Sequence, residues 1–481
     1  MKERKPNILW ICSDQQRYDT LGCYGNTFIN TPVLDDLARN GVLFENAVSQ
    51  SPVCSPSRAA FLTGRYPNTC HMRQNGADIP ESEHLVTKTF HDEGWYCGLS
   101  GKLHIRACNP SSGCTVCEPR IDDGYDEFHW SHDTAPVWGL NNEYYRWLHD
   151  TYGVTYETHP TPQSRFVRYG MSEERHQSYW CAEKAIDFIR ANKDRPWLFS
   201  VNMYDPHHPF DPPKEYLDRY TDDLDSIPLP SYIDKEWETK TVWQRQDHTG
   251  AYNHNAGHAF SEMNDTDHRM QRAAYWAMCD LIDKQVGRII KALKETGQYE
   301  NTIIVFHSDH GEMLGDHGVY LKGPFFYDCC VKVPLIISWP GKIAPGRVSG
   351  LAELMDIPET LLELAGLERI PGMQGKSLLP MMEGRTDEIH TSAYADYMNA
   401  MPWHQEPKAF ASMVRTHEWK LVVSHAGNGE GEMYDLVNDP GELRNLFHVP
   451  EYRDKKLELY ALLLERWAEQ ADPLPIRKSE W

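Results

Sequence analysis

A cysteine stands at the start of the segment of this chain that is best suited to chemistry, Cys54-Ser-Pro-Ser-Arg58, which runs on into an apolar stretch ending at Gly64. Pro56 lacks a backbone N–H and is tolerated in the first turn of a helix, so the segment predicts a reactive side chain at a helix start. Arg58 would place a permanent cation near Cys54, where an anion or oxyanion could be held. A buried cysteine before an ordinary helix is the alternative interpretation.

Further polar residues follow short apolar runs that are typical of buried parallel strands. The apolar runs span residues 7–13, 95–100, 197–203 and 302–308. The polar residues that follow them are, in the same order, Asp14 and Gln15, Lys102 and His104, His207 and His208, and Asp309 and His310. In open α/β sheets ligands bind beyond the carboxyl ends of the strands. The strands therefore predict one convergent site.

Helical patterns lie between these runs, over 31–40 and over 275–296, and a glycine follows each of them. Alternating strands and helices predict an α/β fold with a large, mostly parallel central sheet and helices on both faces. After a helical pattern at 356–365, the alternation of strands and helices ends near residue 385. Strand-like pieces at 411–415 and 419–423 and an amphipathic helix at 452–470 follow.

We therefore expect a catalytic domain over 1–385 and a smaller C-terminal α+β subdomain with an antiparallel sheet over 386–481. Two insertions, about 105–175 and 220–270, interrupt the alternation and are rich in aromatic and polar residues. Loops of this length are usually functional or ordered by partners. Their aromatic side chains could stack on sugar rings, pack as a lid, or form interface arms of a homo-oligomer.

Net charge narrows the classes of partner. The chain has 481 residues and a formal charge of −22 at pH 7, which argues against nucleic acid and anionic membrane surfaces, because both need clustered Lys and Arg. An anionic substrate would need a local cationic pocket, which is workable because salt screens charges over roughly 8 Å. No apolar run reaches the roughly 20 residues of a membrane helix, so no membrane partner is expected.

The amino-terminal residues 1–6 lead straight into a strand-like run and leave no room for a signal peptide, so we expect a cytoplasmic protein. If the sequence is a trimmed form of an exported protein, a periplasmic or secreted location is expected instead. The 12 cysteines are scattered, which favours reduced thiols over a disulfide framework. In the cluster Cys108, Cys114 and Cys117, downstream of Cys70 and His71, the ligand spacing favours free thiols over a structural zinc site.

Asp14, Gln15, Asp309 and His310 form a candidate site for a hard divalent cation such as Ca²⁺, which prefers carboxylate and carbonyl oxygens. In the alternative interpretation, Asp14 only caps a helix.

The pattern C-x-P-S-R-x5-G at Cys54 resembles the maturation signature of type I sulfatases, and residues 302–318 resemble the second metal motif of the alkaline phosphatase superfamily. The resemblance implies an alkaline phosphatase-like fold. It also implies that a maturation enzyme oxidises Cys54 to Cα-formylglycine, whose hydrated aldehyde attacks sulfur. Asp14, Gln15, Asp309, His310 and residue 54 would then hold Ca²⁺. Because Gln15 replaces a frequent acid and His310 the commoner Asn, Mg²⁺ and Mn²⁺ stay open.

Other motifs extend the resemblance over about residues 7–470. Gly-Lys102-Leu-His104 resembles the family's G-K-x-H, whose lysine binds sulfate and whose histidine supports the hydrate. Pro206-His207-His208-Pro-Phe resembles P-H-x-P-F, which implies His207 as the general acid and leaves His208 as a loop residue facing solvent or substrate. Lys322 stands where the family has a second sulfate-binding lysine. Asn75 lines the substrate side of the pocket or is an ordinary loop asparagine.

These features predict a sulfatase that hydrolyses a sulfate monoester of a carbohydrate or a small alcohol. A phosphonate monoester or phosphodiester hydrolase of the same superfamily is the alternative, because Gln15 and P-H-x-P-F resemble that group too. Lys102 and His104 favour the sulfatase, because the sister group typically lacks this pair. A non-catalytic binding protein of the same fold would have lost ligands, and every expected position is filled.

Overall fold

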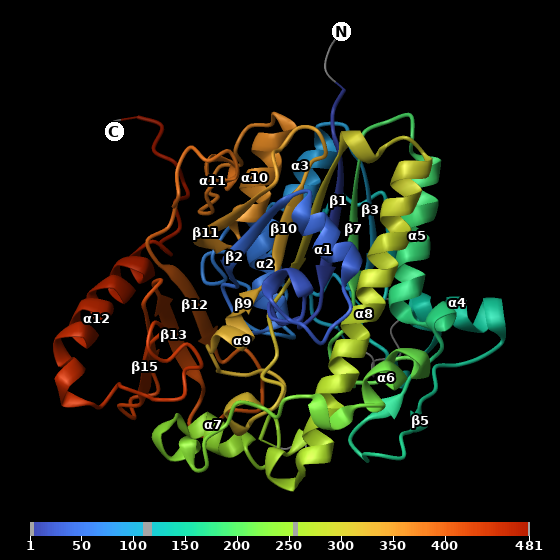
Figure 1. The fold of residues 1–481 in the computed structure, drawn as a ribbon. Coiled ribbons are helices and arrows are strands. Elements are labelled where there is room, and N and C mark those ends of the chain that lie inside the picture. Colours follow the sequence, from blue (N-terminus) through green and yellow to red (C-terminus); the bar gives the residue numbers. More distant parts are fainter. Residues whose placement is uncertain (1–3, 109–117, 254–257, 480–481) are drawn as a thin grey trace.

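The computed structural model describes residues 4–108, 118–253 and 258–479, and its organisation follows from the central strand β1 (Asn7–Ser13). All seven residues of this strand are buried. Side chains alternate along a strand. On one face, Leu9 and Ile11 pack against α1 (Pro32–Arg39), α5 (Gln177–Ala191) and α8 (Asp265–Glu295). On the other face, Ile8 and Trp10 pack with α2 (Cys54–Thr63), α3 (Val86–Asp92) and α10 (Asp356–Ala365). Helices therefore cover both faces of the sheet, as predicted (Figure 1).

The large sheet has the order β11-β2-β10-β8-β1-β7-β3-β4, and β9 pairs with β2. Its pairs are parallel except those of β10 and β9, so the predicted mostly parallel sheet is confirmed. The bounds are β2 Val42–Val48, β3 Tyr96–Gly101, β4 Glu127–Trp130, β7 Trp197–Met203, β8 Thr302–Ser308, β9 Lys332–Val333, β10 Leu335–Ser338 and β11 Gly346–Glu353.

The helices of the described chain begin and end as follows: α1 Pro32–Arg39, α2 Cys54–Thr63, α3 Val86–Asp92, α4 Glu143–Tyr152, α5 Gln177–Ala191, α6 Lys214–Thr221, α7 Val242–Asp247, α8 Asp265–Glu295, α9 Asp328–Val331, α10 Asp356–Ala365, α11 Leu379–Met382 and α12 Arg453–Ala468. The helix predicted over 275–296 is longer than its apolar pattern. It starts at Asp265 because Asn264 and Asp267 form a capping box there.

A second sheet lies in the C-terminal part of the chain. Strands β12 (Ala393–Met398), β13 (Phe410–Arg415), β14 (Trp419–Ser424) and β15 (Gly431–Asp435) pair antiparallel in this order, as predicted. Helix α12 packs against β13 and β14 (Figure 1). The domain boundary near residue 385 stays a prediction.

The first insertion packs against the large sheet through its aromatic residues. It contributes β4 and α4, together with the short hairpin of β5 (His159–Pro160) and β6 (Arg168–Tyr169). Trp130, Trp138 and Tyr144 are buried in the core beside β1 and α5. The second insertion begins at the end of α6, contains α7 and runs into the first turns of α8. Cys114 and Cys117 lie outside the described residues.

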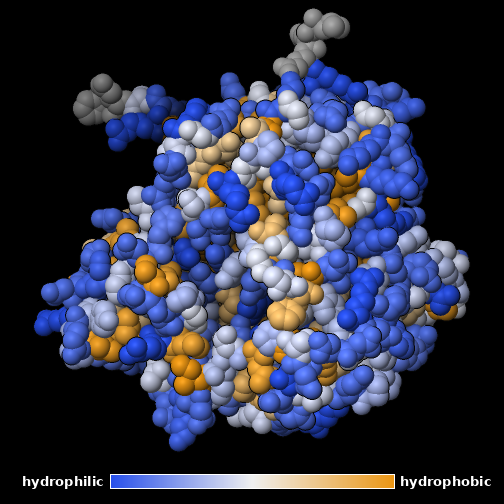
Figure 2. Space-filling view, viewed as in Figure 1, coloured by the Kyte–Doolittle hydropathy of each residue, from blue (hydrophilic) through white to orange (hydrophobic). Residues whose placement is uncertain are grey.

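The visible face of the molecule is largely polar (Figure 2). The face in Figure 2 is mostly hydrophilic, and its apolar patches are small and separate. Among the described residues, no helix has both the length and the apolar character needed to cross a membrane.

A buried ion-pair cluster joins the large sheet's connections to the C-terminal sheet. Arg415 in β13 contacts the Asp328 carboxylate through two bonds of 2.9 and 3.0 Å, and Lys420 in β14 lies 2.7 Å from the same group. Burial alone would raise the pKa of Asp328, but Arg415 and Lys420 hold this pKa well below its usual range. Asp328 is therefore ionised and joins two parts of the chain.

We expect Asp328→Asn to destabilise the protein by about 3–5 kcal/mol, because the buried Arg415 loses its carboxylate partner and Lys420 keeps only the Glu442 carboxylate. A carboxyl group whose pKa is lower in the folded chain than its value near 3.9 in the unfolded chain stabilises the fold fully at pH values above 3.9. This stabilisation is lost as the pH falls through the pKa of the folded chain. The difference between wild type and variant in urea denaturation should therefore be equal at pH 5 and pH 8. Asp218→Asn, in an exposed pair with Lys214, is the control and should have little effect on stability, because water and salt screen this pair. A difference that changes between pH 5 and pH 8 contradicts this account.

Candidate active site

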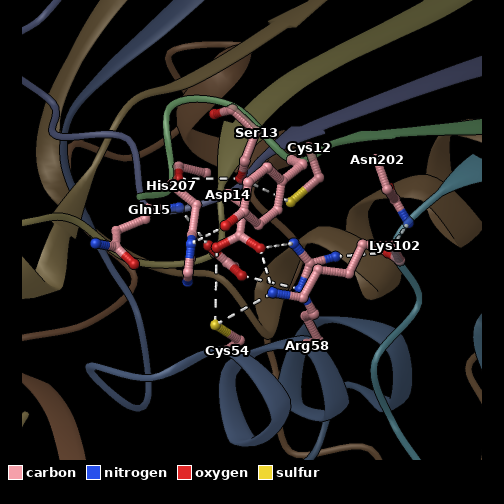
Figure 3. A network of polar contacts seen from close by, with 12 residues as sticks. Cys12, Ser13, Asp14, Gln15, Cys54, Arg58, Lys102, Asn202 and His207 are labelled. Atoms are coloured by element: carbon pink, nitrogen blue, oxygen red, sulfur yellow. Dashed lines mark hydrogen bonds and ion pairs between the residues drawn. The ribbon is translucent and has the colours of Figure 1, made fainter. Parts of the chain in front are cut away.

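Cys54 is the first residue of α2, and its side chain lies at the carboxyl end of the large sheet. It is only 1% exposed. Its Sγ lies 3.2 Å from His310 Nε2, 3.7 Å from Asp14 Oδ1 and 3.7 Å from Lys102 Nζ. Figure 3 shows Arg58 and Lys102 both directed at the Asp14 carboxylate, above the helix that carries Cys54. Residues that follow β1, β3 and β8 therefore lie together beside Cys54.

The side chains of Asp14, Cys54, Asp309 and His310 can each direct a donor atom to one point, because these atoms lie within 4.8 Å of one another. Strands β1 and β8 create this arrangement, since Ser13 pairs with Ser308 and the next residues are the two aspartates. The carboxylates suit a hard divalent cation. A thiol is a soft ligand, so an oxygen at position 54 would suit Ca²⁺ better.

Gln15 has the left-handed backbone conformation, with φ of 68°, and its side chain points away from Cys54 (Figure 3). Its Oε1 accepts a hydrogen bond of 2.5 Å from Lys322, and its Nε2 donates to Glu312. Its backbone N–H donates to Asp309 Oδ1 at 2.9 Å. To bind a metal ion, the Gln15 amide would have to leave Lys322.

Buried cations balance the two aspartates. Arg58 Nε lies 2.9 Å from Asp309 Oδ2 and its Nη2 lies 3.5 Å from Asp14 Oδ2, while Lys102 Nζ is 2.5 Å from the same Asp14 oxygen. Burial alone would raise the pKa of Asp14, but Lys102 and Arg58 hold this pKa far below its usual range. Burial and Asp14 would raise the pKa of the Cys54 thiol as well, yet Lys102 and other nearby cations lower it. The surroundings of Cys54 therefore favour a negative group at this position.

His207 and Lys322 form a second pair at the edge of the site. Lys322 Nζ lies 2.6 Å from His207 Nε2, and His207 Nδ1 lies 2.6 Å from the His208 carbonyl oxygen. A carbonyl only accepts, so Nδ1 carries the proton and Nε2 accepts from the lysine. Burial and the Lys322 charge lower the pKa of His207 well below its ordinary value. The ring is therefore neutral in this arrangement.

The remaining predicted residues take different positions. His104 is buried, with φ of 58°, and its ring lies 4.4 Å from that of His132. Asn75 is half-buried, and its Oδ1 accepts from the Ser55 N–H at 3.0 Å, so it fixes the first turn of α2. His208 stacks on His207 with ring centroids 4.1 Å apart.

A cavity of about 470 Å³ opens beside His207. It is lined by Arg168 and by residues of the segments 133–135, 156–158 and 204–211, which include His208 and Tyr204. Most of these segments belong to the first insertion and to the loop after β7. The insertion thus adds one wall next to the reactive groups.

Sequence reasoning missed three residues that contact the site. The hydroxyl oxygen of Tyr204 lies 2.8 Å from His207 Nδ1, the Glu312 carboxylate accepts a hydrogen bond from the Gln15 amide, and the ring of His132 packs on that of His104. Glu312 lies inside the motif of residues 302–318, and that position was the available signal. No sequence signal marked His132, because the residues around it depend on how β4 pairs with β3.

Comparisons with known proteins fit this geometry. A model of the sulfatase family matches residues 6–367, and a model of the N-sulphoglucosamine sulphohydrolase C-terminal region matches residues 315–469. An arylsulfatase of Clostridium perfringens is 30% identical over 96% of this chain and 94% of its own length. An N-acetylglucosamine-6-O-sulfatase of Bacteroides thetaiotaomicron is 26% identical over 99% of this chain and 88% of its own. The crystal structure of a phosphonate monoester hydrolase of Agrobacterium radiobacter superposes with a TM-score of 0.81 and 26% identity, covering 98% of this chain and 97% of that one.

We expect Ca²⁺ to raise the resistance of the protein to urea, because an ion that binds only the folded chain stabilises it by about 2.7 kcal/mol at roughly 100 times its dissociation constant. Asp309→Asn removes one ligand and should abolish this Ca²⁺-dependent shift. Asp280→Asn is the control, since Asp280 is buried in α8 and its pKa is raised to about 6. Mg²⁺ and Mn²⁺ are compared in the same assay. An undiminished shift in Asp309→Asn would place the ion elsewhere.

Proposed function

Because the chain belongs to the sulfatase family, within the alkaline phosphatase superfamily, we propose that it hydrolyses a sulfate monoester with a formylglycine hydrate at position 54. Membership makes the chain a sulfuric ester hydrolase, as the sequence predicts. The observation that carries the proposal is the ring of cations around Cys54. Lys102 lies 3.7 Å from its sulfur, and Arg58 and Lys322 are buried close by. Such a ring suits an anionic ester and the charge that develops in its transition state.

The proposed nucleophile explains why a buried cysteine stands here. A hydrated aldehyde offers two hydroxyls, one to attack sulfur and one whose loss of a proton releases sulfate and restores the aldehyde. A cysteine thiol has no second hydroxyl and could not release sulfate in this way. Cys54 is 1% exposed, so a maturation enzyme would have to reach it before the chain closes around α2.

The two lysines are proposed to hold the sulfate group from two sides. Lys102 interacts with the buried Asp14, and Lys322 interacts with Gln15 and His207, so both ammonium groups are already placed in the site. Arg58 is instead paired with Asp309 and Asp14, and it acts as a positioning residue that keeps the carboxylates in place. Asp14, Asp309 and His310 would hold the metal ion, with residue 54 and a turned Gln15 completing the set. When bound, the ion supplies Lewis-acid stabilisation of negative oxygen.

His207 is proposed to protonate the leaving alcohol. Its Nε2 is the atom that faces Lys322 at 2.6 Å, and a neutral Nε2 cannot donate. A bound sulfate ester adds negative charge beside the ring and favours its protonated form. When Lys322 turns towards the sulfate, Nε2 is released to carry a proton to the departing oxygen. The acid therefore forms with the substrate in place.

We propose a sulfated carbohydrate as the substrate. The cavity beside His207 has aromatic, hydroxyl and carboxylate groups in its lining, which can pack on a sugar ring and bond its hydroxyls. The similarity to the N-acetylglucosamine-6-O-sulfatase adds support. A small sulfated alcohol would leave much of this cavity to water.

A phosphonate monoester hydrolase is the second candidate. The observation in its favour is the overall likeness to the Agrobacterium radiobacter enzyme, together with Gln15 at the end of β1. The presence of both Lys102 and His104 favours the sulfatase, and Lys102 contacts Asp14 and lies 3.7 Å from Cys54 Sγ.

The function is tested on enzyme produced with a formylglycine-generating enzyme. We expect the tryptic peptide that contains residue 54 to be about 18 Da lighter than the cysteine form, as conversion of thiol to aldehyde requires. We also expect a higher kcat/KM for an aryl sulfate than for a phenylphosphonate monoester, and activity on sulfated saccharides. Full activity with unmodified Cys54 contradicts the mechanism, and a preference for the phosphonate establishes the second candidate. Cys70→Ala, at another buried cysteine, is the control for loss of a thiol.

The adjacent histidines separate the general acid from a neighbour. We expect His207→Gln to lower kcat on an alkyl sulfate by about 10²- to 10⁴-fold, because this leaving group needs a proton. The loss should shrink on an activated aryl sulfate whose leaving group needs none. In His208→Gln, kcat should depend on the pKa of the leaving group as it does in the native enzyme, whether or not KM changes. Equal losses on both substrates in His207→Gln would assign this residue to binding.

A further inference from the structure

A second cluster of metal-binding side chains lies next to the sulfate site. Ring nitrogens of His104 and His132 and the sulfur of Cys108 lie within 4.8 Å of one another. Cys108 Sγ is 3.6 Å from His132 Nδ1, and the two imidazole rings are 4.4 Å apart, edge to face. Neither Cys108 nor His132 takes part in the proposed sulfatase chemistry.

The topology of the sheet brings these residues together. His104 follows β3 and His132 follows β4, and these parallel strands pair with Gly101 beside Trp130. Both histidines therefore emerge at the same edge. Trp130 and Trp138 pack around the His132 ring and shield it from solvent.

We propose that His104, Cys108 and His132 form a Zn²⁺ site. Two imidazoles and one thiolate are the ligand types that Zn²⁺ binds, whereas Ca²⁺ and Mg²⁺ prefer oxygen. Three protein ligands leave a fourth tetrahedral position for water or another group. An independent sign of a ligand is His104 Nδ1, which is buried and has no hydrogen-bond partner among the described residues.

Burial and the neighbouring His132 lower the pKa of His104 well below its ordinary value, and burial and Lys102 do the same for His132. Both directions favour the neutral ring, which is the form that binds a metal ion, while the positive charge of Lys102 itself opposes a second cation nearby. The Cys108 thiol would bind as a thiolate, and its proton would pass to solvent. Asp133 Oδ2 lies 4.0 Å from His132 Nε2 and adds a negative charge close to the cluster.

Zinc at this site would compete with the sulfatase chemistry for His104. This effect on turnover rests on the proposed function, whereas the site itself does not. We expect Zn²⁺ to inhibit the matured enzyme in excess Ca²⁺, and a nitrogen-donor chelator that prefers Zn²⁺ to reverse the inhibition. Loss of an outer-shell partner weakens metal affinity by roughly 10- to 100-fold. Because Cys108→Ser removes a direct ligand, it should raise the Zn²⁺ concentration needed for inhibition by at least this factor.

The direct test uses Co²⁺ as a spectroscopic probe for Zn²⁺, on the full chain under metal-free reducing conditions. The Cys54→Ala variant removes the other candidate thiolate, and excess Ca²⁺ occupies the oxygen ligands of that site. We expect a thiolate-to-cobalt charge-transfer band that saturates at one equivalent and disappears when Zn²⁺ is added. Adding Cys108→Ser should abolish the band, and His132→Gln should weaken Co²⁺ binding.

Cys23→Ser is the matched control, because Cys23 is also a half-buried cysteine, and it should leave the band intact. No band in Cys54→Ala, or a band that survives Cys108→Ser, overturns the site. Urea denaturation of each variant without metal checks that it is folded. A band without inhibition keeps the zinc site and counts against the proposed role of His104 in turnover, so the two proposals fail separately.

Discussion

Two carboxylates buried side by side set the constraint on which the rest of this site depends. Asp14 and Asp309 follow adjacent parallel strands and are both fully buried, so neither can rely on water to stabilise its charge. Arg58 compensates both from one side and Lys102 compensates Asp14 from another. Since a broken buried pair is far more costly than an intact one, the cations are held where the carboxylates require them. The same cations then face residue 54.

This local balance explains how a protein with a net charge of −22 can attract an anion. Lys102 and Lys322 are buried with their partners, and salt screens the charges of the exposed surface over roughly 8 Å. Lys102 and Lys322 approach from different elements, the end of β3 and the loop after β8, so they can contact separate oxygens of one tetrahedral anion. Affinity for the substrate therefore depends on the geometry of these strand ends more than on total charge.

The sequence predicts much of this because the strands are short, apolar and followed at once by polar residues. β1, β7 and β8 have the predicted bounds, and Asp14, Lys102, His207 and Asp309 come together as expected. Other features depend on contacts far apart in the chain. Gln15, for example, turns to Lys322 and Glu312. The position of His132 beside His104 depends on the register of β4, which no local pattern encodes.

Lys102 links the two clusters of the site electrostatically. Its ammonium group lowers the pKa of Cys54 on one side and, after burial, contributes to lowering the pKa of His104 and His132 on the other. One buried charge thus favours an anion at position 54 and adds to the effect of burial on both imidazoles. The Asp14 carboxylate moderates this effect, because it lies 2.5 Å from the same ammonium. A group that draws Lys102 away from Asp14, a sulfate ester included, therefore alters one electrostatic contribution to both clusters at once.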